Sequence, residues 1–179
     1  MIKESFHADY SQLPWAECWA GDPRIRLQML MADIEGQRYA VRMQFQPGLL
    51  AVPHKHTGEV HALTRAGRWN YLEYADSPDN VAGSYLFEPP GTAHTLKIAD
   101  DAGPVTAVIF VIYGAMLHLD DEGSVIGVTD AESVIAEYTA KVRSERPDAT
   151  LRFPIGGFMS YVPVEDAALD KFAARMGSP

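Results

Sequence analysis

Residues 48 to 67 read G-L-L-A-V-P-H-K-H-T-G-E-V-H-A-L-T-R-A-G. The segment contains three histidines between two glycines, and a further histidine, His94, follows in the motif P-P-G-T-A-H. Side chains two residues apart on a β-strand point to the same face, so His54 and His56 share one wall. A short turn and a returning strand would bring His61 beside them, and a second hairpin would supply His94. This arrangement predicts a metal-binding pocket.

The clustering of these histidines favours metal ligands over isolated structural residues. Four of the six histidines in the chain lie in the two segments, which also carry Gly and Pro turn signals. Neutral imidazole is the commonest metal ligand in proteins. The pattern predicts that His54, His56 and His94 bind one divalent metal ion. His61 is either a fourth ligand or a hydrogen-bond donor that lines the pocket beside an open coordination position.

The same residues resemble the cupin superfamily. Its two motifs run G-x5-H-x-H-x3-4-E-x6-G and G-x5-P-x-G-x2-H-x3-N. This chain matches them at Gly48, His54, His56, Gly83, Pro89, Gly91 and His94. It departs from them in that His61 stands in the glutamate position, Gly67 arrives one residue early and Ile98 replaces the asparagine.

A narrower resemblance lies in H-T-G-E-V-H-A-L-T-R-A-G-R-W-N-Y-L-E-Y (56–74) and A-G-S-Y-L-F-E-P-P-G-T-A-H-T-L (82–96). The chain is similar here to the 2,4'-dihydroxyacetophenone dioxygenase family and, more distantly, to acetylacetone-cleaving dioxygenase. The resemblance covers about residues 12 to 140. It implies Fe(II) held by histidines, and cleavage of a C–C bond of a β-diketone or 2-hydroxyketone with O2.

Two carboxylates are candidate catalytic residues. The resemblance places Glu88 near the metal, where a carboxylate accepts from the ring N–H of a ligating histidine; otherwise Glu88 is a rim residue paired with Lys97. Alternation in residues 69–74 places Glu73 on one face with Trp69 and Tyr71. If that face is the barrel interior, an unpaired charge there is costly, and Glu73 would contact a ligand or substrate. Otherwise, Glu73 points to solvent beside Arg68.

The histidine ligands restrict the type of reaction more than they restrict the choice of metal. Neutral imidazoles leave a divalent ion its full charge, which favours an anionic ligand such as an enolate and lowers the pKa of a bound carbonyl substrate. Imidazole also suits Zn, Cu and Ni, so iron follows from the resemblance, and purified protein is expected to accept Zn, Mn or Ni as well. Two alternatives remain open: an oxygen-independent Mn or Zn cupin that acts as a decarboxylase or isomerase, and a metal-binding regulatory cupin similar to that of anti-sigma factors.

The hydrophobic pattern predicts an all-β protein. Apolar and polar residues alternate as on half-buried strands, and one apolar run is nearly continuous. Strands are therefore predicted at about 25–29, 39–45, 69–74, 105–113, 117–119 and 124–128. His118 lies outside both motifs and is expected to be structural. We expect a single-domain antiparallel β-barrel, or jelly roll, of the cupin type, with an N-terminal arm and the barrel in residues 1–128.

Residues 129–179 are predicted to form a helical extension packed on the same domain. Thr129-Asp130-Ala131-Glu132 matches a capping box, and an apolar stripe at Val134, Ile135, Tyr138 and Val142 follows it. A second helix is expected at about 165–176. The extension either braces the barrel or crosses to a second subunit.

Composition excludes several classes of protein. The net charge of −9 argues against nucleic-acid binding, and one cysteine, Cys18, excludes an internal disulfide framework. No signal peptide is recognised at the N-terminus, and no apolar run reaches the roughly 20 residues of a membrane helix, so a cytoplasmic protein is expected. The arm at 5–23, with Trp15 and Trp19, covers one barrel end or closes a pocket or a dimer. The expected partners are a small carbonyl substrate, O2 and copies of the chain in a homodimer or homotetramer.

Overall fold

The computed structural model describes residues 6–7, 9–157, 160–163, 170 and 174. Its strands are β1 (Ile25–Asp33), β2 (Arg38–Phe45), β3 (His54–His56), β4 (Val60–Ala66), β5 (Arg68–Tyr71), β6 (Asn80–Val81), β7 (Tyr85–Glu88), β8 (Ala93–His94), β9 (Leu96–Ile98), β10 (Thr106–Tyr113), β11 (Met116–Leu119), β12 (Val125–Thr129), β13 (Pro154–Gly157) and β14 (Ser160–Pro163). Within these ranges the α-helix is α1 (Ala131–Glu145), and short 3-10 helices cover Tyr10–Gln12, Trp19–Gly21 and Leu72–Tyr74.

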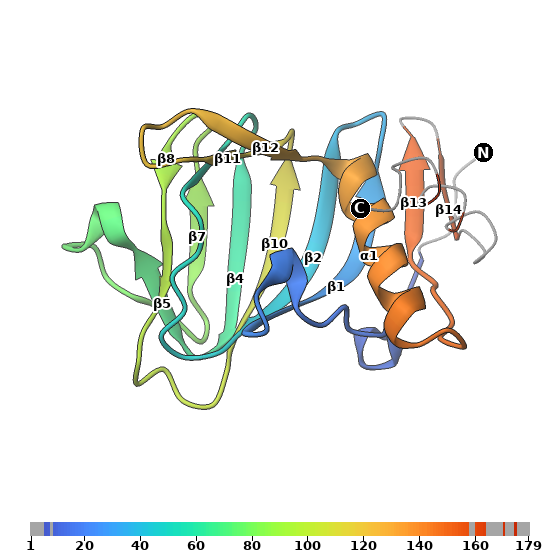
Figure 1. Cartoon of the computed structure of the whole chain (residues 1–179), viewed down its shortest axis with the longest axis horizontal. Coiled ribbons are helices and arrows are strands. Elements are labelled where there is room, and N and C mark those ends of the chain that lie inside the picture. Colours follow the sequence, from blue (N-terminus) through green and yellow to red (C-terminus); the bar gives the residue numbers. More distant parts are fainter. Residues whose placement is uncertain (1–5, 8, 158–159, 164–169, 171–173, 175–179) are drawn as a thin grey trace.

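The strands form three sheets that curve around one interior (Figure 1). The largest runs β14-β13-β1-β2-β10-β4-β7, a second runs β12-β11-β3-β8, and a third runs β6-β5-β9. Neighbouring strands pair antiparallel, except that β13 runs parallel to β1. The predicted fold class, an all-β antiparallel jelly roll, is confirmed.

Alternation along the strands builds the core. Leu27 and Met29 of β1, Val41 of β2 and Val108 of β10 point inward and are almost fully buried. Trp69 and Tyr71 of β5 also point inward, with exposed fractions of 1% and 5%. Each fully buried side chain of this size contributes about 1.5–3 kcal/mol to folding. The apolar faces predicted from the sequence therefore line the inside of the barrel.

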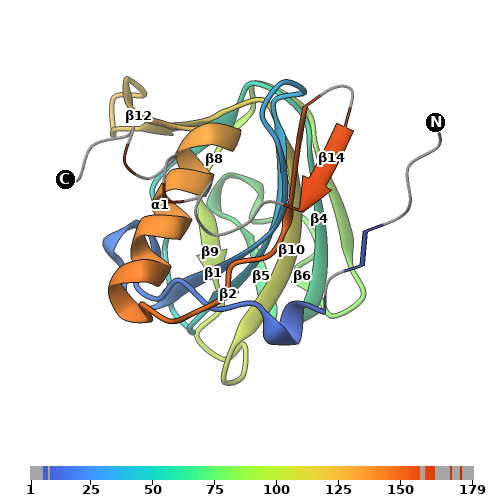
Figure 2. The same cartoon turned by 90° about the vertical axis from the view of Figure 1, so that its right-hand side faces the viewer.

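Helix α1 packs beside β1 and covers one end of the barrel (Figure 2). Its predicted apolar stripe is buried, as Ile135, Tyr138 and Val142 show. The capping box predicted at Thr129 is wrong by one residue. Asp130 is the N-cap: its carboxylate accepts from the backbone N–H of Ser133, and the Ser133 hydroxyl accepts from the Asp130 N–H, both at 2.8 Å. Aspartate caps a helix as well as threonine does.

The segment after α1 differs from the purely helical extension that the sequence predicts. β13 joins the largest sheet beside β1, and β14 pairs with β13. The predicted second helix at 165–176 lies outside the described residues, apart from 170 and 174. Among the described residues, no helix has both the length and the apolar character needed to cross a lipid bilayer.

Candidate metal centre

Three histidines converge from two paired strands. β3 carries His54 and His56 on one face, and β8 pairs with it antiparallel so that His94 lies directly opposite His54. One ring nitrogen from each histidine lies within 4.8 Å of the others. His56 and His94 are buried, and His54 is partly buried. Strands β3 and β8 thus bring together the three histidines that the sequence predicts as metal ligands.

A tight turn fixes the position of His94. Gly91 has a φ of +84°, a left-handed conformation that favours glycine. Its backbone N–H donates to the carbonyl of His56 at 2.8 Å. This hydrogen bond holds the turn against β3. As a result, His94 in the next strand, β8, faces His54 and His56.

Glu88 completes the cluster from the end of β7. Its Oε2 lies 3.3 Å from Nε2 of His94 and 3.7 Å from Nε2 of His56, and the side chain is buried. The hydroxyl of Tyr71 donates to its Oε1. Burial raises the pKa of Glu88, but His94, Tyr71 and His56 outweigh that effect and lower the pKa overall, so the carboxylate is ionised at neutral pH.

The polar atoms of the cluster fit a bound divalent ion. Nε2 of His94 and Oε2 of Glu88 are buried and have no hydrogen-bond partner within the part of the chain that the structure describes. His54 uses Nδ1 to donate to the carbonyl of Val52 at 3.0 Å, which leaves its Nε2 as an acceptor. Buried polar atoms without partners are rare in folded proteins and indicate a missing partner. Three buried histidines could hold a metal ion here.

His54 and His56 are neutral at neutral pH, as metal ligands must be. Burial lowers the pKa of His54 to about 4, and it lowers the pKa of His56 to about 4 as well. At neutral pH both rings therefore carry a free lone pair. A metal ion would meet ligands that require no deprotonation.

These pKa values predict an acid-sensitive metal-free protein. Unfolded histidine has a pKa near 6.5, so between about pH 6.5 and pH 4 the unfolded chain binds more protons than the folded chain, and stability falls as the pH falls. We expect a loss of roughly 2 kcal/mol for each of the two histidines between pH 7 and pH 5. Urea denaturation of chelator-treated protein at both pH values measures this loss. In a His54→Phe, His56→Phe double variant most of it should disappear, and an unchanged loss there would contradict the assignment.

His61 is not brought to the other histidines, which corrects the prediction of a fourth ligand or a pocket-lining donor. β3 and β4 do not form a hairpin: β3 belongs to the sheet with β11 and β8, and β4 pairs with β10 and β7. Val60 and Ala62 of β4 point inward, so His61 between them points outward. Its ring nitrogens lie 2.6 Å from the hydroxyl of Tyr85 and 3.3 Å from the carboxylate of Glu59.

Glu73 also lies outside the cluster. The strand that carries Trp69 and Tyr71 inward ends at Tyr71, and Glu73 falls in the 3-10 helix that follows. Its carboxylate accepts from the backbone N–H and the hydroxyl of Thr95, both at 2.8 Å. The side chain is exposed, and the prediction that it contacts a ligand or substrate is not supported.

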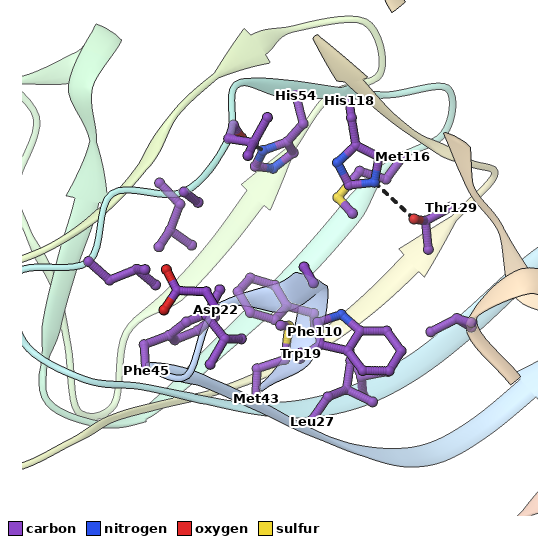
Figure 3. A pocket seen from close by; sticks show the side chains of 18 of the residues that line it. Trp19, Asp22, Leu27, Met43, Phe45, His54, Phe110, Met116, His118 and Thr129 are labelled. Carbon is purple, nitrogen blue, oxygen red and sulfur yellow. Dashed lines mark hydrogen bonds between the residues drawn. The ribbon is translucent and has the colours of Figure 1, made fainter. Parts of the chain in front are cut away.

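The cluster opens into a cavity of about 770 Å³ inside the barrel. Figure 3 shows the apolar side of this cavity, with the labelled side chains of Leu27, Met43, Phe45 and Phe110. Trp19 of the N-terminal arm is buried and lines this cavity, which agrees with one of the alternatives for the arm, that it closes a pocket. The site is therefore a polar cluster on one wall of a largely apolar chamber.

Two cavity residues have roles that the sequence does not predict. Tyr71 stacks on the ring of His94 at 4.0 Å between centroids while it donates to Glu88. His118, expected to be structural, lines the cavity instead. Alternation along β5 gives the inward direction of Tyr71, but no sequence signal identifies its partners, because they come from β7 and β8.

One family pattern matches the chain. The pattern described as the ChrR cupin-like domain covers residues 3–117. The comparison with curated protein sequences gives no match.

Solved structures share the fold. A protein of unknown function with a cupin-like fold from Ralstonia eutropha JMP134 is 28% identical, with a TM-score of 0.80, over 90% of this chain and 99% of that one. An RmlC-like cupin protein from the same organism is 23% identical, with a TM-score of 0.73, over 79% and 88% of the two chains. An acetylacetone dioxygenase from Acinetobacter johnsonii is 18% identical, with a TM-score of 0.66, over 79% and 94%.

Proposed function

We propose that this chain, which belongs to the family of ChrR cupin-like domains, is a mononuclear non-haem iron dioxygenase that cleaves a C–C bond of a β-diketone or 2-hydroxyketone. One observation carries the proposal: His54, His56 and an ionised, buried Glu88 line the apolar cavity, and His94 converges with the other two histidines beside them. A site that only held a structural metal would use its ligands to close the coordination sphere and would have no need of a substrate-sized chamber.

His54, His56 and His94 would hold the ion. Bound there, a divalent metal would polarise a substrate carbonyl, and iron would add the redox chemistry that reaction with O2 requires. Glu88 is placed to take a proton from a substrate that becomes an enolate, because its Oε2 has no hydrogen-bond partner within the described residues. Tyr71 orients Glu88 through its hydrogen bond and packs against His94.

The cavity suggests the size of the substrate. Pockets of about 300–1,000 Å³ bind drug-sized ligands, and this one measures about 770 Å³. Its far wall is formed by apolar and aromatic residues such as Leu27, Phe45 and Phe110. An apolar carbonyl compound larger than acetylacetone fits this chamber better than a small acid, which disfavours a decarboxylase of small acids.

The fold of the acetylacetone dioxygenase from A. johnsonii supports this proposal as an analogy of architecture. The test is an oxygen-electrode screen of β-diketones and 2-hydroxyketones of increasing size with iron-loaded protein. We expect stoichiometric O2 consumption, with both atoms of labelled O2 in the two carbonyl products. If no compound supports O2 uptake while the same compounds bind the metal-loaded protein, the dioxygenase proposal is wrong.

Assembly of the chain into a homodimer or homotetramer stays a prediction.

Glu88→Gln is expected to slow turnover by about 10- to 100-fold and to leave metal content nearly intact. The amide keeps the shape and the hydrogen bond from Tyr71, but it cannot accept a proton. Steady-state kinetics together with metal analysis by mass spectrometry measure both effects. Glu59→Gln, on the outer face of the barrel, is the matched control and should behave as the natural chain does. A loss of metal in the Glu88 variant equal to the loss of activity would make Glu88 a ligand instead.

A further inference from the structure

A second pair of polar side chains lies beside the histidine cluster, on the same wall of the cavity. β11 runs between β3 and β12, and His118 is the register partner of His54 on one side and of Gly127 on the other. Paired residues of adjacent strands point to the same face. Both His54 and His118 therefore face the cavity, as Figure 3 shows.

Thr129 joins His118 at this position. Nε2 of His118 and the hydroxyl of Thr129 lie 2.9 Å apart, and both residues line the cavity. Thr129 is available for this contact because Asp130, and not Thr129, caps helix α1. Ile126 and Val128, on the opposite face of β12, are exposed, whereas Thr129 lines the cavity.

Gly127 makes room for the ring. A Cβ atom at this position would lie 3.3 Å from Cδ2 of His118. That distance is closer than ordinary van der Waals contact, so with any larger residue at this position the imidazole would have to shift by a few tenths of an ångström.

We propose that His118 and Thr129 form a second binding site in the cavity, which takes a substrate oxygen that does not contact the metal. A neutral imidazole has one donor and one acceptor, and a hydroxyl has one donor and two acceptors. The bond between them uses one hydrogen, and the pair keeps one hydrogen to donate. Neither side chain makes another hydrogen bond within the described part of the chain. The pair is therefore ready to bind a carbonyl or hydroxyl oxygen.

The position of the pair specifies where that oxygen lies. Neighbouring strands are about 4.7–4.9 Å apart, so His118 on β11 lies about one strand spacing from His54, and Thr129 on β12 lies about two. This matches a ligand in which the third oxygen is on the carbon chain next to the chelating pair, as in a triketone. The inference rests on the proposed function, because it assumes that a dicarbonyl group binds at the metal.

The test is a binding measurement that needs no turnover. Zinc-loaded protein is titrated calorimetrically with diacetylacetone, a triketone, and with the diketone of equal chain length that lacks the third carbonyl. We expect the natural chain to bind the triketone about tenfold more tightly, which is typical of one hydrogen bond in a buried site. His118→Phe and Thr129→Val should reduce this ratio to about one while affinity for the diketone and metal content stay the same. Met116→Leu, on the same strand and in the same cavity, is the control and should keep the ratio.

Three outcomes would overturn the inference. They are a ratio near one in the natural chain, an unchanged ratio in both variants, or an equal loss of affinity for both ligands, which would mean that the residues only support the cavity. Thermal unfolding of each variant identifies one that fails to fold, and Thr129→Val then decides, because it changes only a hydroxyl for a methyl group. The measurement is independent of O2. If the zinc form discriminates between these ligands and the iron-loaded form consumes O2 with neither of them, the dioxygenase proposal is wrong and this one stands.

Discussion

Replacement of His94 by alanine is expected to reduce bound metal from about one ion per chain to less than about a tenth of that value. His94 supplies one of only three converging imidazoles, and its Nε2 is buried with no hydrogen-bond partner among the described residues. The two remaining histidines would bind the ion too weakly to retain it against a chelator or solvent. The change should also abolish O2 consumption. Metal analysis after dialysis against a weak chelator measures the occupancy.

His61→Ala is the matched control for this experiment. Its ring lies on the outer face of β4, between Tyr85 and Glu59, and its loss should leave metal content unchanged. Circular dichroism spectra of both variants would show whether they keep the fold. Full occupancy in His94→Ala, or equal metal loss in the two variants, would contradict the assignment of His54, His56 and His94 as ligands.

Exchange of iron for zinc is expected to lower turnover with O2 by at least about 100-fold, which corresponds to about 2.7 kcal/mol of activation free energy. Zinc suits imidazole ligands and polarises a carbonyl, but it has no accessible redox change. The zinc form should therefore bind a β-diketone and shift its absorbance to that of the enolate without consuming O2. Side-by-side titration and oxygen-electrode traces on the same preparation measure both properties.

A reconstituted iron sample is the control, since it should recover activity after the same metal removal. Equal turnover by the zinc form under anaerobic conditions would support the alternative of oxygen-independent isomerase or decarboxylase chemistry. Binding of a diketone by neither form would remove the catalytic proposal altogether and favour a regulatory metal-binding domain.

The sequence by itself determined the features that depend on local rules. His54 and His56 share a face because side chains on a strand repeat every two residues. Gly91 predicts the turn before His94 because the turn needs a left-handed residue. The inward direction of Tyr71 and the buried stripe of α1 follow from the same kind of periodicity.

Only the tertiary structure decided which strands meet. His61 was a candidate because it stands in the glutamate position of the cupin motif, and Glu73 because alternation places it on one face with Trp69 and Tyr71. The chain changes sheet before His61 and leaves the strand before Glu73. A shift of one residue in strand register turns a side chain from the core to solvent. The residues around that position do not show such a shift in their sequence. His118 shows the converse. Its place beside His54 arises from the pairing of β11 with β3, a contact between segments more than sixty residues apart, and such pairings are fixed by global packing.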